Sequence, residues 1–205
     1  RKMTRIIAGS AGSLRLAVPP RGTRPTSDRV REAIFSTLDA WDFITGTRVL
    51  DLYAGSGALG LEALSRGAVH ATLVEKHSAA AAIARKNSEL VVAAVRKNGG
   101  QASAEVAAAN VQSWLEMRAS QAGLAESHEL YDVALIDPPY DFSEETITAN
   151  LASLLPLLAP NAAVMVERDK RSPAPTLPVG YRHIKVKNYG ETSCYWLEPD
   201  AASTI

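Results

Sequence analysis

The sequence predicts an α/β fold in which a mostly parallel sheet is covered by helices on both faces. From Thr47 onward, short apolar segments with strand character alternate with longer segments of helical periodicity. The apolar segments are continuous, which is typical of strands that are buried on both faces. Polar or glycine-rich positions occur at the ends of three of these strands, at residues 51–57, 75 and 137–140. Ligands of such sheets bind beyond the carboxyl ends of the strands, so these positions are the candidate functional residues.

The first 40 residues precede this alternation and have a different pattern. Two short extended segments between residues 4 and 18 flank a glycine-containing turn and predict a small β-hairpin. Prolines and a glycine then predict a linker. Thr26 or Ser27 can cap a helix that runs to about Ala40, with apolar residues at helical spacing on one face. We therefore expect an N-terminal hairpin extension at residues 1–22 and one main domain at residues 23–200.

The remaining elements follow in alternating order and account for the predicted sheet. The last two strands flank an Asn-Tyr-Gly turn, which predicts an antiparallel hairpin that closes the sheet. The expected strands are residues 48–52, 71–75, 102–108, 131–136, 162–167, 181–187 and 192–197. One expected helix follows the first of these strands and ends at Ser65. Three more are expected over residues 77–95, 111–122 and 144–158.

The composition is that of a globular protein with one full hydrophobic core. The chain has 205 residues, of which 46% are hydrophobic and 21% charged, values that argue against wholesale disorder. No apolar run approaches the roughly 20 residues that span a bilayer, and the N-terminus lacks a signal-peptide core. The single cysteine excludes an internal disulfide framework, and the four scattered histidines form no metal-ligand pattern. We expect a cytoplasmic monomer without a metal ion.

Positive charge is concentrated at the N-terminus of an otherwise neutral chain. Residues 1–31 carry eight arginine or lysine residues and one acid, whereas the net charge of the whole chain is zero. This distribution is consistent with a surface that contacts phosphate groups and equally with a solvated, charged terminus.

A glycine-rich turn follows the first strand of the main sheet and predicts a cofactor site. Residues 55–60 (GSGALG) fit the pattern G-x-G-x-x-G between a strand and a helix. Glycines allow the backbone to approach a ligand, and the helix N-terminus favours negative charge. A pyrophosphate would fit there, and so would the carboxylate of the methionine part of S-adenosylmethionine (SAM).

Two carboxylates near the turn favour SAM over a nicotinamide dinucleotide. Asp51 precedes the turn, where it would repel a pyrophosphate but attract the α-ammonium group of SAM. Glu75 ends the second strand of the main sheet, where a carboxylate can accept hydrogen bonds from both ribose hydroxyls of either cofactor. The alternative is a tight strand–helix turn with a capping acid.

The segment Asp137-Pro138-Pro139-Tyr140 follows the most apolar strand and predicts the reactive part of the site. The two prolines set a rigid turn and remove two backbone donors, which leaves the Asp137 carboxylate and the Pro138 carbonyl as acceptors. Two acceptors can hold the N–H groups of an exocyclic base amine and stabilise positive charge as methylation begins. Tyr140 offers a ring on which an unpaired or flipped base can stack. The alternative is a strand-terminating turn with a surface tyrosine.

Several segments together resemble the bacterial small-subunit (16S) ribosomal RNA guanine-N2 methyltransferases. Residues 51–68 (DLYAGSGALGLEALSRGA) are similar to the cofactor motif of that family, and residues 24–35 (RPTSDRVREAIF) to its more restrictive N-terminal signature. Residues 5–9 (RIIAG) and 137–140 (DPPY) also match, in the family's order. The resemblance implies a Rossmann-like class I SAM-dependent methyltransferase fold, with a mostly parallel seven-stranded sheet, a C-terminal antiparallel hairpin and a small N-terminal β-hairpin.

The resemblance also implies an activity and a set of site residues. The substrate would be a guanine in the small ribosomal subunit or its assembly intermediate, methylated on N2 with SAM. The base would be held by Asp137, Pro138, Pro139 and Tyr140. The cofactor would contact Ser27, Asp51, Ala54, Gly55, Ser56, Gly57, Glu75, Lys76, Asn110 and Val111. Arg24, Thr26, Arg29 and Arg31 would face the RNA.

Three other activities are compatible with parts of this pattern. An adenine-N6 nucleic-acid methyltransferase would present a similar exocyclic amine to the same turn. An NAD(P)-binding oxidoreductase could use residues 55–60, although it would leave residues 137–140 without a role. A non-catalytic RNA-binding module would have no use for an intact Asp137 and Tyr140.

Overall fold

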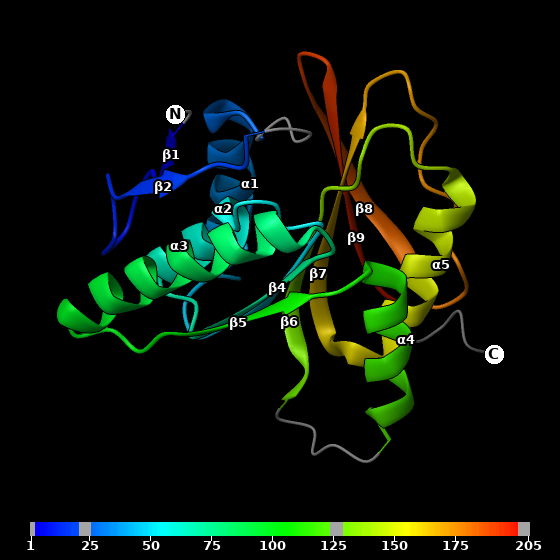
Figure 1. Cartoon of the computed structure of the whole chain (residues 1–205). Coiled ribbons are helices and arrows are strands. Elements are labelled where there is room, and N and C mark those ends of the chain that lie inside the picture. Colours follow the sequence, from blue (N-terminus) through cyan, green and yellow to red (C-terminus); the bar gives the residue numbers. More distant parts are fainter. Residues whose placement is uncertain (1–2, 21–25, 124–128, 201–205) are drawn as a thin grey trace.

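A seven-stranded sheet forms the centre of the computed structural model, which describes residues 3–20, 26–123 and 129–200 (Figure 1). Its strand order is β5-β4-β3-β6-β7-β9-β8. The first five strands in this order are parallel to one another, and β9 is antiparallel to both of its neighbours, β7 and β8. The strands are β3 (Arg48–Leu52), β4 (His70–Glu75), β5 (Ser103–Ala108), β6 (Tyr131–Ile136), β7 (Leu158–Asp169), β8 (Tyr181–Tyr189) and β9 (Thr192–Pro199). This order confirms the predicted fold class.

Helices cover both faces of the sheet because successive strand residues point to opposite sides. Leu50 packs with the helices on one face, whereas its neighbour Val49 belongs to the hydrophobic cluster on the other. The first face is covered by α4 (Val111–Gln121) and α5 (Glu144–Leu154), and the second by α1 (Asp28–Ala40), α2 (Ala58–Ser65) and α3 (Ser78–Lys97) (Figure 1).

The N-terminal hairpin, β1 (Met3–Arg5) and β2 (Arg15–Ala17), packs on the side of the sheet that carries α1 to α3. Ile6 and Leu16 are fully buried in that hydrophobic cluster. Polar contacts fix the hairpin in place, since the Glu62 carboxylate of α2 accepts from the backbone N–H groups of Ile7 at 2.8 Å and Ala8 at 3.1 Å. The hairpin therefore shares a core with the main sheet, while the division at residues 22 and 23 stays a prediction.

Two predicted boundaries are wrong around the connection between α5 and β7. The predicted helix over residues 144–158 ends at Leu154, and a short 3-10 helix, η2 (Leu155–Leu157), follows it. Pro156 lies within this turn, where it has no N–H to continue the α-helical hydrogen bonds. β7 consequently starts at Leu158 rather than at the predicted residue 162. No helix in the described ranges is long and apolar enough to cross a membrane.

Candidate active site

The predicted cofactor turn and the predicted catalytic turn lie side by side at the carboxyl ends of β3 and β6. These strands are hydrogen-bonded neighbours, with Asp51 opposite Leu135 and Leu52 opposite Ile136. β4 pairs with β3 on its other side, so its last residue, Glu75, ends at the same edge of the sheet. Three segments that are far apart in the sequence therefore meet at one place, as the sheet order requires.

The glycines of the first turn have two different tasks. Gly55 and Gly57 have φ angles of 56° and 84°, which are strained for residues with a side chain. Gly60 has no such conformation; a Cβ there would lie 2.4 Å from Cδ2 of Leu73. The first two glycines thus shape the turn, whereas the third allows α2 to pack closely on the sheet.

Asp51 is a buried carboxylate with one oxygen free. The residue is only 1% exposed, and its Oδ2 accepts from the backbone N–H of Gly60 at 2.9 Å. Its Oδ1 is buried and has no hydrogen-bond partner among the described residues. Burial raises the pKa of this carboxyl well above its ordinary value, because the charged form loses hydration. An unpaired buried oxygen of this kind can receive a cationic ligand group such as an ammonium.

Glu75 holds the glycine turn while facing the same edge. Its Oε1 accepts from the backbone N–H of Gly55 at 3.1 Å, and its Oε2 accepts from that of His77 at 2.7 Å. Each carboxylate oxygen has a second lone pair, so the residue can also accept hydrogen bonds from ligand hydroxyls.

The predicted catalytic turn combines buried and exposed residues. Pro138 is buried, whereas Pro139 and Tyr140 are exposed, and the Tyr140 side chain is 80% accessible. The Asp137 carboxylate is partly buried, and its Oδ2 accepts from the Thr26 hydroxyl at 2.8 Å. This arrangement leaves the ring of Tyr140 free to contact a flat ligand.

The Arg168 side chain supports this turn, a role that was not predicted from the sequence. The side chain is almost completely buried, and its guanidinium donates to the backbone carbonyls of Pro139 at 3.2 Å, Tyr140 at 3.4 Å and Phe142 at 2.9 Å. A guanidinium presents several donors in a fixed plane, so this one side chain can hold three carbonyl groups of the loop. The signal in the sequence was a charged residue near the end of a mostly apolar strand.

Tyr53 supports the same turn from the side of α5. It has a positive φ of 63° without being a glycine, and its hydroxyl hydrogen-bonds Asn150. Its ring packs edge-on against Phe142, with 5.3 Å between ring centroids. A strained residue is retained only where its surroundings fix it, so Tyr53 is part of the loop's support.

Glu167 is the second residue that sequence reasoning missed. It lies on β7, the strand next to β6, and its Oε2 is 3.3 Å from the same Thr26 hydroxyl that contacts Asp137. Burial and the negative charge of Asp137 raise the pKa of Glu167 to about 9. Nothing in the local sequence marks it, because its proximity to Asp137 depends on the pairing of β6 with β7.

The predicted RNA-facing residues are divided by the structure. Arg29 is exposed on the first turn of α1. The prediction for Arg31 is wrong, because its side chain is only 1% exposed and its guanidinium contacts Asp28 at 2.9 Å and the carbonyl of Arg5 at 2.7 Å. The contact with Arg5 joins α1 to the hairpin. Thr26 points to the two carboxyls described above, and Arg24 lies outside the described residues.

The remaining predicted cofactor residues lie around the same edge. Ser27 and Asn110 use their side chains as N-caps of α1 and α4, where they accept from Val30 and Ser113. The other positions flank the turns: Ala54 is partly buried, Ser56 and Val111 are buried, and Lys76 is exposed.

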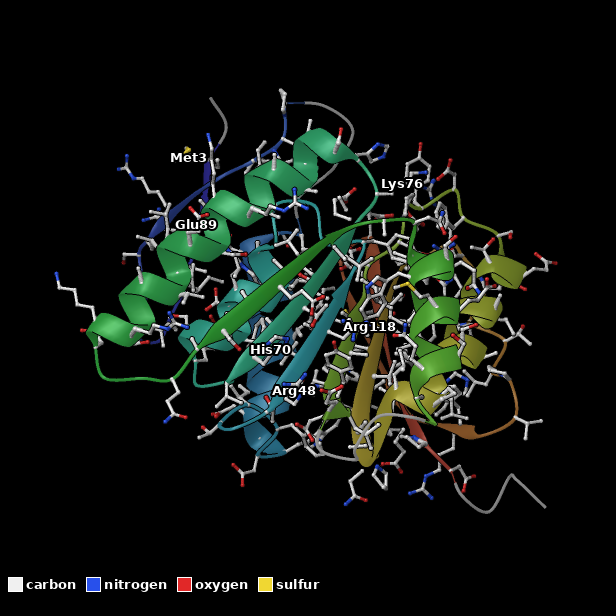
Figure 2. All side chains as sticks on the ribbon, turned by 60° about the horizontal axis from the view of Figure 1, so that its bottom comes forward. Met3, Arg48, His70, Lys76, Glu89 and Arg118 are labelled. Atoms are coloured by element: carbon white, nitrogen blue, oxygen red, sulfur yellow. The ribbon has the colours of Figure 1, made fainter. Side chains whose placement is uncertain are left out.

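Two cavities lie away from this edge. One, of about 430 Å³, is at the amino ends of the strands, where it is lined by Arg48, His70, Glu105 and Arg118 among others; Figure 2 shows Lys76 and His70 at opposite ends of β4. Across the described segments, no group of three or more histidine, cysteine or acidic side chains is placed to hold a metal ion.

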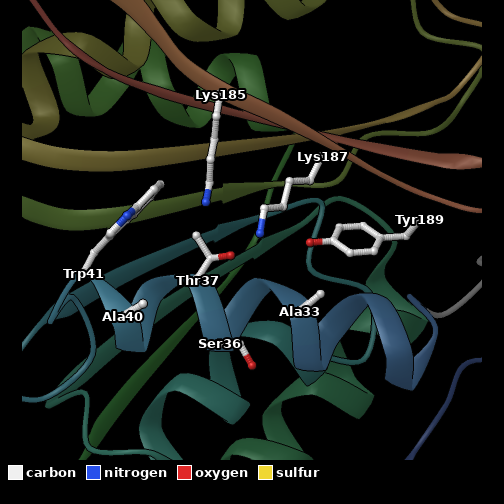
Figure 3. Close-up of a pocket in the computed structure, with 8 residues that line it drawn as sticks. All are labelled: Ala33, Ser36, Thr37, Ala40, Trp41, Lys185, Lys187 and Tyr189. Carbon is white, nitrogen blue, oxygen red and sulfur yellow. The ribbon is translucent and has the colours of Figure 1, made fainter.

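The second cavity is a basic groove of about 290 Å³ between α1 and β8 (Figure 3). Lys185 and Lys187 extend from β8 toward α1, between Trp41 at one end and Tyr189 at the other (Figure 3). The Lys185 ammonium lies 4.9 Å from the centre of the Trp41 ring. We refer to these residues together as the α1–β8 groove. Tyr189 pairs with Thr192, which pairs with Asp169 at the end of β7, so this end of the groove is the one nearer the active-site edge.

Comparisons with known proteins agree on one family. The family model described as conserved hypothetical protein 95 matches residues 4–198. Ribosomal RNA small subunit methyltransferase D of Escherichia coli (strain K12) is 36% identical over 192 residues, which cover 92% of this chain and 86% of the relative. The protein of that name in Haemophilus influenzae is 34% identical, with coverages of 92% and 90%. The solved structure of yhhF from Escherichia coli matches with a TM-score of 0.76 and 33% identity, covering 98% of this chain and 99% of that chain.

Proposed function

Since this chain belongs to the family of ribosomal RNA small subunit methyltransferase D, we propose that it transfers a methyl group from SAM to the exocyclic N2 amine of a guanine in small-subunit (16S) ribosomal RNA. We place this reaction in the cytoplasm, on the small ribosomal subunit or an assembly intermediate, with the enzyme acting as a monomer.

One observation carries the proposal beyond family membership. The free oxygen of Asp51 and the carboxylate of Asp137 belong to neighbouring strands and open onto the same edge of the sheet. The first can bind a cationic cofactor group, and the second can accept a hydrogen bond from an amine. A methyl donor and an amine acceptor require this juxtaposition, because their reacting atoms must come within about 3–3.5 Å of each other.

The residues around the glycine turn fit SAM, which supplies an electrophilic methyl group when it is bound. Asp51 would pair with the α-ammonium group, and the N-terminus of α2 at Gly57 and Ala58 would face the carboxylate. Glu75 would accept hydrogen bonds from the ribose hydroxyls. Asn110 and Val111 would border the adenine, while Ser27, Ala54, Ser56 and Lys76 would complete the surroundings.

The catalytic turn would orient the base amine. The Asp137 carboxylate and the Pro138 carbonyl would accept its two N–H groups, which directs the nitrogen lone pair toward the methyl group and stabilises the developing positive charge. The exposed ring of Tyr140 would stack on the base, a contact worth about 1–3 kcal/mol. Pro139 keeps the turn rigid, and Arg168 holds its carbonyls in place.

The RNA would reach this turn across a basic surface that includes Arg29 and the α1–β8 groove. Within the described residues, neither Lys185 nor Lys187 forms an ion pair with an acid, so both charges are available to phosphate groups. Aromatic rings at both ends of the groove suit an unpaired strand. Arg24 and Thr26 remain proposed RNA contacts, whereas buried Arg31 is not proposed.

The competing activities have less support. An oxidoreductase would leave the Asp137–Tyr140 turn unused, and the curated relatives cited above are methyltransferases. A non-catalytic RNA-binding module would not need the free Asp51 oxygen. An adenine-N6 methyltransferase would use the same turn, so the modified base must be identified directly.

The experiment that tests the proposal is methyl transfer from radiolabelled SAM to small ribosomal subunits purified from cells that lack this gene. The nucleosides of the product are then separated. Protein-free 16S ribosomal RNA and subunits from unaltered cells serve as matched substrates.

We expect label in N2-methylguanosine, with less on subunits that are already modified. Label in N6-methyladenosine would replace guanine by adenine as the substrate. No label despite SAM binding would contradict the proposed substrate, and absence of SAM binding would contradict the cofactor as well.

A further inference from the structure

Asp137 does not act alone, because a second carboxyl lies beside it. Glu167 on β7 and Asp137 after β6 both contact the hydroxyl of Thr26, at 3.3 Å and 2.8 Å. A hydroxyl carries a single hydrogen and can donate it to only one acceptor at a time. The shorter contact assigns this hydrogen to Asp137, so the second carboxyl needs a proton of its own to complete the cluster.

The surroundings of this pair offer little compensation for two negative charges. The Arg168 guanidinium donates to three backbone carbonyls, and it faces neither carboxyl in a hydrogen bond. Two like charges in a partly buried site repel strongly, so one shared proton lowers the free energy of the pair. The titratable or charged groups that face or adjoin Glu167 are Asp137, Cys194 on β9, and Arg168 and Asp169 on its own strand. The charge of Asp137 in turn acts on Asp51.

We propose that Glu167 is a positioning residue that stays protonated and donates a hydrogen bond to Asp137, so that Asp137 remains the charged acceptor for the base amine. This inference rests on the proposed function and names a residue that it did not include. It also explains why Thr26 points inward: the Thr26 hydroxyl donates to Oδ2 of Asp137 and helps to fix the carboxylate plane.

The proton balance of the reaction fits this division. When the amine nitrogen forms a bond to the methyl carbon, the bond between that carbon and sulfur breaks and the nitrogen becomes positively charged. One N–H proton must then leave. Ionised Asp137 can accept it and pass it to water, whereas Glu167 keeps its proton throughout. If both carboxyls were protonated beforehand, Asp137 could not take up this proton.

The acid–base properties agree with the geometry. The pKa of Glu167 is raised to about 9 by burial and by the charge of Asp137, so the residue is neutral below that pH. The pKa of Asp137 is also raised by burial, and the hydrogen bonds from Thr26 and Glu167 and the charge of Arg168 oppose this rise. The thiol of Cys194, which pairs opposite Glu167, has its pKa raised to about 12 by burial and by both carboxyls, and it is therefore neutral as well.

The test compares Glu167→Gln with Glu167→Ala, because the amide N–H of glutamine can replace the O–H donor of a protonated carboxyl and the two groups have nearly the same shape. Glu191→Gln changes an exposed acid at the same edge of the sheet and serves as the control. The kcat for subunit methylation is measured across the pH range, together with the Kd for SAM.

We expect Glu167→Gln to keep kcat near the wild-type value at neutral pH and to lose the decline that the wild type shows above about pH 9. Glu167→Ala should lower kcat on the order of 100-fold with an unchanged Kd for SAM, because Asp137 loses its orientation. If Glu167→Gln is as impaired as Glu167→Ala, a charged Glu167 is required and the proposal is wrong. Wild-type activity of Glu167→Ala would also overturn it.

A second measurement does not depend on activity. Unfolding releases the Glu167 proton at neutral pH, since the unfolded residue has an ordinary pKa; wild-type stability should therefore fall, relative to Glu167→Gln, as pH rises toward about 9. A pH-independent difference would contradict the shared proton. If the wild type transfers no methyl group at all, the proposed function fails, while this unfolding comparison still decides the protonation of Glu167.

Discussion

The carboxyl and amino ends of the parallel strands differ in how they use charge. Four acids lie at the carboxyl ends, namely Asp51, Glu75, Asp137 and Glu167. The buried guanidinium near them, that of Arg168, donates its hydrogen bonds to backbone carbonyls. At the amino ends, Arg118 pairs with Glu105 at 3.1 Å, and both ring nitrogens of His70 are hydrogen-bonded, to Ser103 and Thr72 (Figure 2).

The candidate active site lies at the carboxyl edge, whereas the cavity of about 430 Å³ lies at the amino ends. Most polar side chains there hydrogen-bond one another, although the buried Nε of Arg48 has no hydrogen-bond partner among the described residues. Burial lowers the pKa of His70, so that this residue adds no positive charge at neutral pH. The carboxyl edge instead keeps a free buried oxygen on Asp51 and two carboxyls around one hydroxyl. Buried polar atoms without partners cost stability, and a bound ligand would satisfy those at the carboxyl edge.

The largest expected effect contrasts the two ends of one strand, β6. Asp137→Ala should lower methyl transfer by about 100-fold or more, because the acceptor for the amine is lost, while the Kd for SAM stays within several-fold. Asp132→Ala, at the start of β6, removes an acceptor for the Arg48 N–H and should cost about 1 kcal/mol of stability with little change in kcat. Steady-state kinetics and thermal unfolding measure both. Equal loss of kcat in the two variants would abolish the distinction between the edges.

The next effect separates binding from stability at Asp51. Asp51→Asn should weaken SAM binding on the order of tenfold or more, because an amide cannot pair with an ammonium group. The same variant should be more stable than the wild type at neutral pH, since the raised pKa of Asp51 marks a charge that destabilises the folded state. This gain should shrink as pH falls toward about 4, where the unfolded carboxyl also binds a proton. Calorimetry with SAM and unfolding at several pH values test both signs. Unchanged SAM affinity would remove Asp51 from the cofactor site.

A smaller effect is expected from the α1–β8 groove. Lys185→Glu combined with Lys187→Glu should weaken RNA binding and reduce the slope of log K against log salt by about 2, while SAM affinity is unchanged. The control, Lys86→Glu with Lys97→Glu, makes the same charge change on exposed positions of α3. Binding to small subunits at several salt concentrations gives the slopes. Identical slopes for both pairs would mean that the groove does not contact phosphate groups.

The smallest effect is expected at the amino ends. Glu105→Gln breaks an ion pair with Arg118 in which both side chains are substantially exposed, so the stability should change by about 0.2–1 kcal/mol. Methyl transfer and SAM affinity should be unaffected. A loss of activity in this variant would show that the cavity at the amino ends also takes part in the reaction.

Much of the candidate site was predictable from local sequence. The turn after β3, the acid that ends β4 and the turn after β6 each lie next to an apolar strand, and parallel strands align their carboxyl ends at one edge. The role of Gly60 was less accessible, because its need for a small side chain comes from Leu73 on a different strand. Boundaries near Pro156 were also mistaken, since the helical periodicity continued past the point where hydrogen bonding stops.

The sequence by itself determined the α/β class, the order of the elements and the residues of both turns. These depend on periodicity, glycine and proline, which act within a few residues of their position. Only the tertiary structure decided that Arg31 is buried, that Glu167 lies beside Asp137 and that Arg168 supports the catalytic turn. The contacts of Arg31 with Arg5 and of Arg168 with Phe142 each join residues 26 positions apart, and Thr26, which links the two carboxyls, is 141 positions from Glu167. They follow from which strands pair and which helix packs on the hairpin, and no local pattern encodes that choice.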